Sequence, residues 1–449
     1  MATTPAASTE RAAPPGSRAD AASARFEELE AYRGIAALLV VVFHAYQYSK
    51  QALGLSRYAY EGTPLHILFG NFDGAVACFF TLSGFLLFLP FARAALNGRS
   101  APSARGFLVR RAIRILPTYY LAILVVWTWR YTGYPGQWAD LAEHLTFTHI
   151  FDRAHTFWTI GPAWSLADEA IFYAALAALG PALCALCERL RTPFARVAVL
   201  ASAPMSLALA SGAYKWWAFV MAHVPLDDSP IYFGPLAKLD TFAIGMLLAV
   251  AATAARGRVP LRGPARRALL GGAVLVILTA AAAARAEFPL IDLYFHTLCG
   301  LGFALLLTIT VLGPRGSGLE RLLRLRPLQS LGLISYSVYL WHEPLMLELG
   351  RHHLLIQSAP QAFPRNAALL VLLAIAVATL SYLALEWPTQ LLRHLFSRDG
   401  RLANRYGESN GGDADAIADV RPIVPLPTPK AWDPGEAFTA ATWSEERAT

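Results

Sequence analysis

Ten apolar segments divide the sequence, each close to the ~20 residues that a helix needs to cross a lipid bilayer. Hydrophobic residues make up 55% of the 449 residues and charged residues only 15%, a composition typical of polytopic membrane proteins. The pattern predicts an all-α membrane protein, a bundle of about ten transmembrane helices. The expected segments are residues 33–52, 74–92, 113–132, 165–187, 196–213, 235–254, 267–285, 292–312, 332–350 and 366–385.

Arginines between these segments predict the orientation of the chain. The loops after the second, fourth, sixth and eighth segments contain 18 arginines, whereas the opposite loops contain about half as many basic residues. By the positive-inside rule the arginine-rich loops, and with them both termini, are expected in the cytoplasm. The net charge of +7 is explained by this topology, so no nucleic-acid partner is expected.

Three parts are expected along the chain. Residues 1–24 are rich in Ala, Ser, Pro and Arg and lack the apolar core of a secretory signal, so they are expected to be a disordered cytoplasmic tail. Residues 25–396 form the transmembrane domain. Residues 397–449 are rich in Pro, Asp, Glu and Gly, are too short for a second catalytic domain, and are expected to be a second disordered cytoplasmic tail.

No metal site is predicted. The four cysteines all fall within apolar segments and are interpreted as small core residues. His144, His149 and His155 lie in the longest outer loop, but their spacing matches no common ligand pattern. The many aromatic residues of that loop are typical of an interfacial belt, with stacking on sugar rings as the alternative.

The first apolar segment carries an arginine at its entrance and a histidine inside it. Arg33 and His44 are close to three helical turns apart, so both lie on one helix face, about 16 Å from each other. An ionisable residue at bilayer depth usually faces a bundle interior or a wet cavity and marks a functional path. His44 is therefore a candidate functional residue, with a simple hydrogen bond to a neighbouring helix as the alternative.

Two further ionisable groups lie beside apolar segments. Arg111 and Arg114 share a helix face at the expected cytoplasmic surface, where their guanidinium groups suit either a phosphate-bearing ligand or anionic lipid head groups. Asp168 and Glu169 open the fourth segment. A histidine inside the membrane is a plausible partner for such a carboxylate, whereas an interfacial cap near the helix N-terminus fits Asp168 better than Glu169.

Polar residues also mark the ninth and second segments. Ser335, Tyr339 and His342 follow helical spacing and form one stripe that suits either a polar substrate or hydrogen bonds between helices. Ser83 and Gly84 of the second segment are small enough for close helix approach, and packing is their expected role.

Together these stretches resemble acyltransferase family 3, the integral membrane acyltransferases that O-acylate surface glycans and some secreted metabolites. Near the end of the domain, Glu386-Trp-Pro388 stands where the family usually has Glu-Arg-Pro. The chain is similar to the stand-alone form, without a fused extracytoplasmic hydrolase-like domain. The motifs that carry the resemblance are Arg33-x10-His44, Phe80-x-x-Ser-Gly-Phe85, Arg111-x-x-Arg114, Trp164-Ser-Leu-x-x-Glu169 and Ser335-Tyr-Ser-x-Tyr-Leu-x-His342, in family order.

The resemblance implies an O-acyltransferase of the bacterial inner (cytoplasmic) membrane. It would move an acyl group, most often acetyl, from acyl-CoA (acetyl-CoA) as co-substrate to a hydroxyl of a carbohydrate or glycosylated acceptor. Membrane lipids surround such a protein, no permanently bound cofactor is implied, and no oligomeric state follows from the sequence.

The resemblance also implies roles for particular residues. His44 is the expected general base, and Glu169 is the carboxylate expected to orient it. The phosphates of coenzyme A are expected at Arg33, Arg111 and Arg114. Acceptor-binding or supporting roles are expected for Trp164, Ser335, Tyr339 and His342.

A proton-coupled transporter of a polar solute is the alternative, because buried His, Glu and Tyr residues suit a proton pathway. Transporters often contain paired repeats, and the two halves of this sequence show no convincing similarity. Release of free coenzyme A would distinguish acyl transfer from transport.

Overall fold

The computed structural model describes residues 16–51, 58–131, 137–255, 261, 263–285, 289–313, 317–356 and 362–390. All of these except Gly16–Ser23 belong to one compact unit, Ala24–Gly411. Helix α1 begins at Gly16, inside the segment 1–24 that the sequence predicts to be a tail. The remainder of that tail, and the whole of the tail expected at 397–449, lie outside the described residues.

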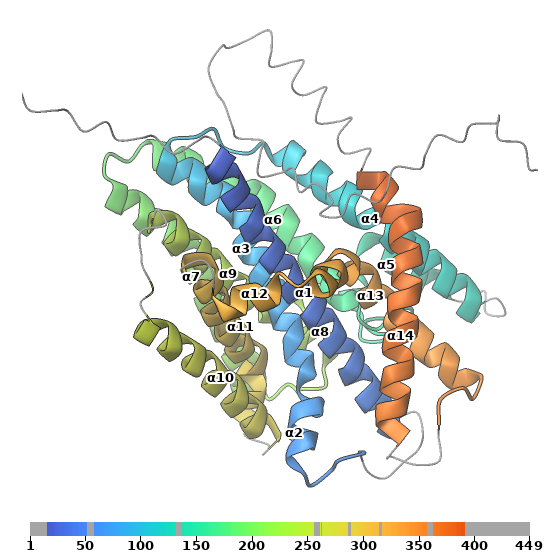
Figure 1. Ribbon diagram of the computed structural model, residues 1–449. Coiled ribbons are helices and arrows are strands. Elements are labelled where there is room, and N and C mark those ends of the chain that lie inside the picture. Colours follow the sequence, from blue (N-terminus) through green and yellow to red (C-terminus); the bar gives the residue numbers. More distant parts are fainter. Residues whose placement is uncertain are drawn as a thin grey trace, which may run out of the picture. The chain divides into compact units, whose positions relative to one another are not determined.

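Within the described residues, every regular element is a helix, which confirms the predicted all-α class. The helices are labelled along the chain in Figure 1. They are α1 (Gly16–Gln51), α2 (Pro64–Gly70), α3 (Ala75–Asn97), α4 (Ala104–Tyr131), α5 (Trp138–Thr146), α6 (Ala163–Glu188), α7 (Pro193–Lys215), α8 (Ser229–Tyr232), α9 (Pro235–Ala254), α10 (Gly263–Arg285), α11 (Pro289–Leu312), α12 (Gly318–Leu323), α13 (Arg326–Arg351) and α14 (Phe363–Ser381). Short 3-10 or π segments follow α2 (η1, Phe72–Gly74), α5 (η3, His149–Phe151), α7 (η4, Trp216–Met221) and α14 (η6, Tyr382–Glu386).

Nine stretches in the described part of the chain are helical, long and apolar enough to cross a membrane, so the chain is a multi-pass membrane protein. Each of them corresponds to a segment expected from the sequence. The expected segment at 332–350 falls in α13, which is long enough to span but is not one of the nine, because its polar stripe lowers its hydropathy.

Helix α3 lies at the centre of the core and packs against α6, α9 and α11. Gly84 makes the contact with α9 possible, since a Cβ there would clash with the backbone of Phe242. Gly245 of α9 meets the backbone of Thr81 in the same way, which confirms the packing role expected for Gly84. Helices α7 and α10 lie at the periphery and expose leucines such as Leu209 and Leu275, as expected for surfaces that face lipid.

Candidate active site

A close helix contact sets the register between α1 and α13. A Cβ on Gly34 would lie only 2.7 Å from the backbone nitrogen of Gly332, so the two backbones touch where both residues are glycine. His44 and His342 each lie ten residues beyond these glycines, on α1 and α13 respectively. Because the two helices run parallel, one glycine contact also brings the two histidines together, about 15 Å farther along.

The two imidazoles form a hydrogen-bonded pair. His342 Nε2 lies 3.2 Å from His44 Nδ1, and the ring centroids are 4.9 Å apart. Nδ1 of His342 lies 2.7 Å from the carbonyl oxygen of Tyr339, and Nδ1 of His44 lies 3.0 Å from that of Val40. A carbonyl only accepts, so both Nδ1 atoms carry hydrogen and His342 Nε2 accepts from His44.

In the neutral imidazole, this assignment leaves His44 Nε2 without a proton. It makes no hydrogen bond with the described residues, and the His44 side chain is partly exposed, whereas His342 is fully buried. His44 is thus an imidazole with one nitrogen anchored and the other available as a base. Sequence reasoning singled out both histidines but did not connect them.

A second set of contacts joins α13 to the start of α6. The hydroxyls of Tyr339 and Ser165 are 2.7 Å apart, and both lie near the carbonyl of Pro162. The Tyr339 ring also packs against His342, with centroids 5.8 Å apart. This chain of contacts therefore reaches from α6 through Tyr339 to the histidine pair.

The other two expected supporting residues are also buried. Trp164 packs its ring against Phe233, with centroids 4.7 Å apart. Ser335 donates a hydrogen bond to the carbonyl of Gly332 within α13, at 2.7 Å. With Tyr339 and His342, all four residues expected to bind the acceptor or support the site have side chains inside the bundle.

Glu169 has different neighbours from those expected. Its carboxylate accepts a short hydrogen bond from Ser83, a residue for which only packing was expected. Glu169 also interacts electrostatically with Arg33 and with Tyr173, one turn farther along α6. The position beside His44 at which the sequence suggested Glu169 holds His342.

The three expected donor-binding arginines converge on one group of acidic and phenolic side chains. Arg33 interacts with Glu169 and Glu386, and its Nη1 lies 3.7 Å from Glu30 Oε1. Arg114 also interacts with Glu386, whose carboxylate accepts a hydrogen bond from Ser337 of α13. Arg111 and Arg114 both act on the Tyr173 hydroxyl, which lies beside Glu169. The first, third and fourth motifs therefore meet in space, together with Glu386 near the end of the domain.

Burial divides the expected site residues into two groups. Arg33, His44, Arg111, Arg114 and Glu169 are partly exposed, so a substrate can touch them. The other four are buried and can act only through their neighbours, as described above. The division separates side chains that a ligand could reach from side chains that the surrounding helices enclose.

A buried ionic cluster at the start of α9 was not found from the sequence. Lys238 is 2% exposed, and its Nζ lies 3.3 Å from His296 Nδ1 and 4.1 Å from the centre of the Tyr232 ring. Asp168 is 1% exposed, interacts with Lys238 and makes no hydrogen bond with the described residues. The interpretation of Asp168 as an interfacial cap is therefore wrong. Asp168 was noted from the sequence, but Lys238 and His296 were not. An isolated charged residue in an apolar segment has no spacing pattern that would indicate its partners.

The outer loop also contains a buried polar cluster. The rings of His144 and His149 stack with centroids 4.1 Å apart, and burial lowers the pKa of His149 to about 3. His144 Nδ1 lies 3.1 Å from Asp140 Oδ1, and Thr159 donates a hydrogen bond to the same carboxylate. Burial raises the pKa of Asp140, but His144 and Thr159 outweigh it, so the net pKa is lowered. These residues tie α5 to the loop that leads into α6.

One of three comparisons with known proteins gives a match. A family model for an acyltransferase domain, that of acyltransferase family 3, matches residues 26–384. This range contains all five motifs that carry the resemblance, from Arg33 to His342. No curated protein and no solved structure gives a match. The match covers most of the chain and decides between enzyme and transporter in favour of the enzyme. The chain is a membrane acyltransferase and belongs to acyltransferase family 3.

Proposed function

We propose that the enzyme moves an acetyl group from acetyl-CoA to a hydroxyl of a carbohydrate or glycosylated acceptor, and that His44 is its general base. The observation that carries this proposal is the histidine pair. It leaves His44 Nε2 unprotonated and partly exposed, while Nδ1 is held by Val40 and His342. An imidazole fixed in this tautomer presents a nitrogen that can accept the proton of an acceptor hydroxyl.

In the proposed reaction, His44 Nε2 takes the proton of the acceptor hydroxyl while the hydroxyl oxygen attacks the thioester carbonyl carbon. The carbon–sulfur bond then breaks, and the thiolate takes the proton from the His44 imidazolium. The products are an O-acyl ester and free coenzyme A. His342 Nε2 keeps its hydrogen bond to His44 Nδ1 throughout, which orients the ring and stabilises its charged form.

An acyl-histidine intermediate is compatible with the same geometry. In that version His44 Nε2 attacks the thioester and coenzyme A leaves, after which the acceptor hydroxyl displaces the acyl group from the histidine. Both versions need an unprotonated Nε2.

We place the coenzyme A phosphates at Arg33, Arg111 and Arg114. Their planar guanidinium groups suit phosphate oxygens, and all three are partly exposed. Glu169 and Glu386 lie close enough to act on these charges. The carboxylates therefore hold the arginine side chains in position before the donor arrives.

The separation of about 16 Å along α1 suits an extended donor. Phosphates at Arg33 leave the pantetheine arm to reach toward His44, where the thioester reacts. By the positive-inside rule the donor enters from the cytoplasmic side of the bacterial inner membrane. The acceptor then approaches from the opposite side, along the aromatic outer loop.

The experiment is mass spectrometry of envelope glycans and secreted glycosides from a deletion strain. The strain is complemented with wild type, with His44→Ala, or with His353→Ala as a control outside the site, at matched protein levels. We expect the mass increment of an acetyl group with wild type and His353→Ala, but not with His44→Ala. Identical profiles from wild type and His44→Ala would overturn the proposal, and an increment of another size would change the acyl group assigned.

A further inference from the structure

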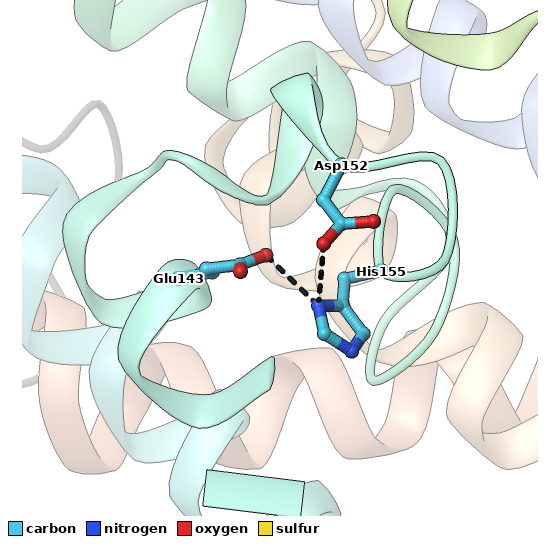
Figure 2. A group of neighbouring side chains, drawn as sticks. All are labelled: Glu143, Asp152 and His155. Carbon is cyan, nitrogen blue, oxygen red and sulfur yellow. Dashed lines mark hydrogen bonds and ion pairs between the residues drawn. The ribbon is translucent and has the colours of Figure 1, made fainter. Parts of the chain in front are cut away.

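Three side chains of the outer loop direct ligand atoms at one point, outside the site described above. His155 Nδ1 lies 2.9 Å from Glu143 Oε2 and 3.4 Å from Asp152 Oδ2, and the three atoms all lie within 4.8 Å of one another. Figure 2 shows both carboxylates turned toward the same ring nitrogen. Glu143 comes from the last turn of α5, whereas Asp152 and His155 come from the loop that follows η3.

The two distances from His155 Nδ1 are close to the spacing of neighbouring ligand atoms in a tetrahedral metal site. Zinc binds histidine nitrogen and carboxylate oxygen at about 2.0–2.2 Å, which places neighbouring ligand atoms about 3.3 Å apart. The two distances from His155 Nδ1 lie on either side of this value. One imidazole and two carboxylates provide three of four positions, and the partial exposure of all three side chains leaves the fourth to water.

The backbone holds Asp152 and His155 in place without using the ligand atoms. Asp152 Oδ1 accepts the backbone N–H of Ala154 at 2.7 Å, which leaves Oδ2 to face His155. The carbonyl of Asp152 accepts the N–H groups of His155 and Thr156, at 3.1 and 2.9 Å. One tight turn therefore positions both side chains. Hydrogen bonds to groups around a metal site commonly orient its ligands in this way.

The charges at this point also favour a divalent cation. Within the described residues, the only cationic partner of the Glu143 and Asp152 carboxylates is His155. Arg153, which directly follows Asp152 in the sequence, instead pairs with Asp227 and Asp228, at 3.9 and 3.8 Å. A divalent ion bound between the Glu143 and Asp152 carboxylates would cancel both negative charges.

We propose that Glu143, Asp152 and His155 bind one divalent metal ion, with Zn²⁺ preferred because imidazole is among the ligands. The ion joins the end of α5 to the loop that leads into α6. Histidine spacing alone did not predict this site, because two of its three ligands are carboxylates and the fold brings Glu143 to the other two.

The test measures zinc bound by the full-length protein, purified in detergent through a tag without histidines. The protein is stripped with EDTA, equilibrated with zinc chloride, desalted and assayed by mass spectrometry of the metal. The variants are His155→Ala, Asp152→Asn and the control His352→Ala. His352 also pairs with a carboxylate, Glu348, at 2.8 Å and is more exposed, but it pairs with no second carboxylate among the described residues.

We expect wild type and His352→Ala to retain similar amounts of zinc. Each should exceed His155→Ala by about one ion per chain. Asp152→Asn keeps an acceptor for the Ala154 N–H, so the lower zinc content expected for this variant reports the lost ligand charge. Equal zinc content in wild type and His155→Ala would overturn the proposal. The same conclusion would follow if His352→Ala lost as much zinc as His155→Ala, since that would indicate adventitious binding by surface histidines.

Discussion

Replacing Gly34 by alanine adds a methyl group at the closest contact between α1 and α13. Its Cβ would lie 2.7 Å from the backbone nitrogen of Gly332 and 2.9 Å from the carbonyl carbon of Leu331, whereas ordinary contact begins at 3.4 Å. Backbone atoms cannot rotate away as a side chain can. The helices must therefore separate locally by the difference between 2.7 and 3.4 Å, about 0.7 Å.

This movement is large enough to break the histidine pair. If it is transmitted along the helices, the distance from His44 Nδ1 to His342 Nε2 rises from 3.2 Å to about 3.9 Å, beyond hydrogen-bonding range. Misplacement of a catalytic group by about 1 Å can cost about 100-fold in rate. We therefore expect Gly34→Ala to lower acyl transfer by about 10- to 100-fold, with about 1–3 kcal/mol of destabilisation from overpacking.

The assay measures acylated product per amount of folded protein, with folding checked by size-exclusion chromatography in detergent. Gly271→Ala in α10 is the matched control, because a Cβ there has nothing within 4 Å and activity should be unchanged. Wild-type activity in folded Gly34→Ala would refute the reasoning that this contact positions His44, the proposed base.

Three further predictions concern two side chains of the candidate site and one buried ion pair. His342→Gln should lower kcat by about 100-fold and leave KM for acetyl-CoA nearly unchanged, because His342 orients the base without touching the donor; a rise in KM alone would contradict this. Ser83→Ala removes a hydrogen bond to a charged group worth about 1.5 kcal/mol, so steady-state assays should show activity about tenfold lower; unchanged activity would remove Ser83 from the site. Lys215 and Asp240 form a buried ion pair, so Lys215→Met should destabilise the protein by about 3–5 kcal/mol in thermal unfolding, and adding Asp240→Leu should restore part of the loss. A double variant no more stable than the single one would contradict the pairing.

The transmembrane helices could be predicted because each is one continuous apolar stretch with polar, glycine or proline residues at its ends. The expected segment 235–254 coincides with α9, where Gly234 and Pro235 mark the start of the helix. The expected segment 332–350 was identified in the same way, as an apolar stretch of spanning length, and it falls in α13. This helix is not among the nine candidate spans of the described residues, because its polar residues lower its hydropathy.

Candidate site residues could be named from the sequence, but most of the partners that they contact in the structure could not. His44 and His342 meet across 298 positions of sequence because Gly34 and Gly332 let two backbones touch, and no local pattern encodes that contact. Ser83 looked like a small packing residue until the fold placed Glu169 beside it. Spacing rules describe neighbours on one helix, whereas these pairs depend on how separate helices dock.

The most direct test of the central claim is acetyl transfer in inverted membrane vesicles that contain the natural acceptor. Acetyl-CoA labelled in the acetyl group is added to vesicles with wild type or His44→Gln at matched levels, and both labelled glycan and free coenzyme A thiol are measured. If His44 is the base, wild type gives label and thiol in equal amounts, and His44→Gln gives neither above background. Full transfer by His44→Gln would contradict both the direct and the acyl-histidine versions of the mechanism.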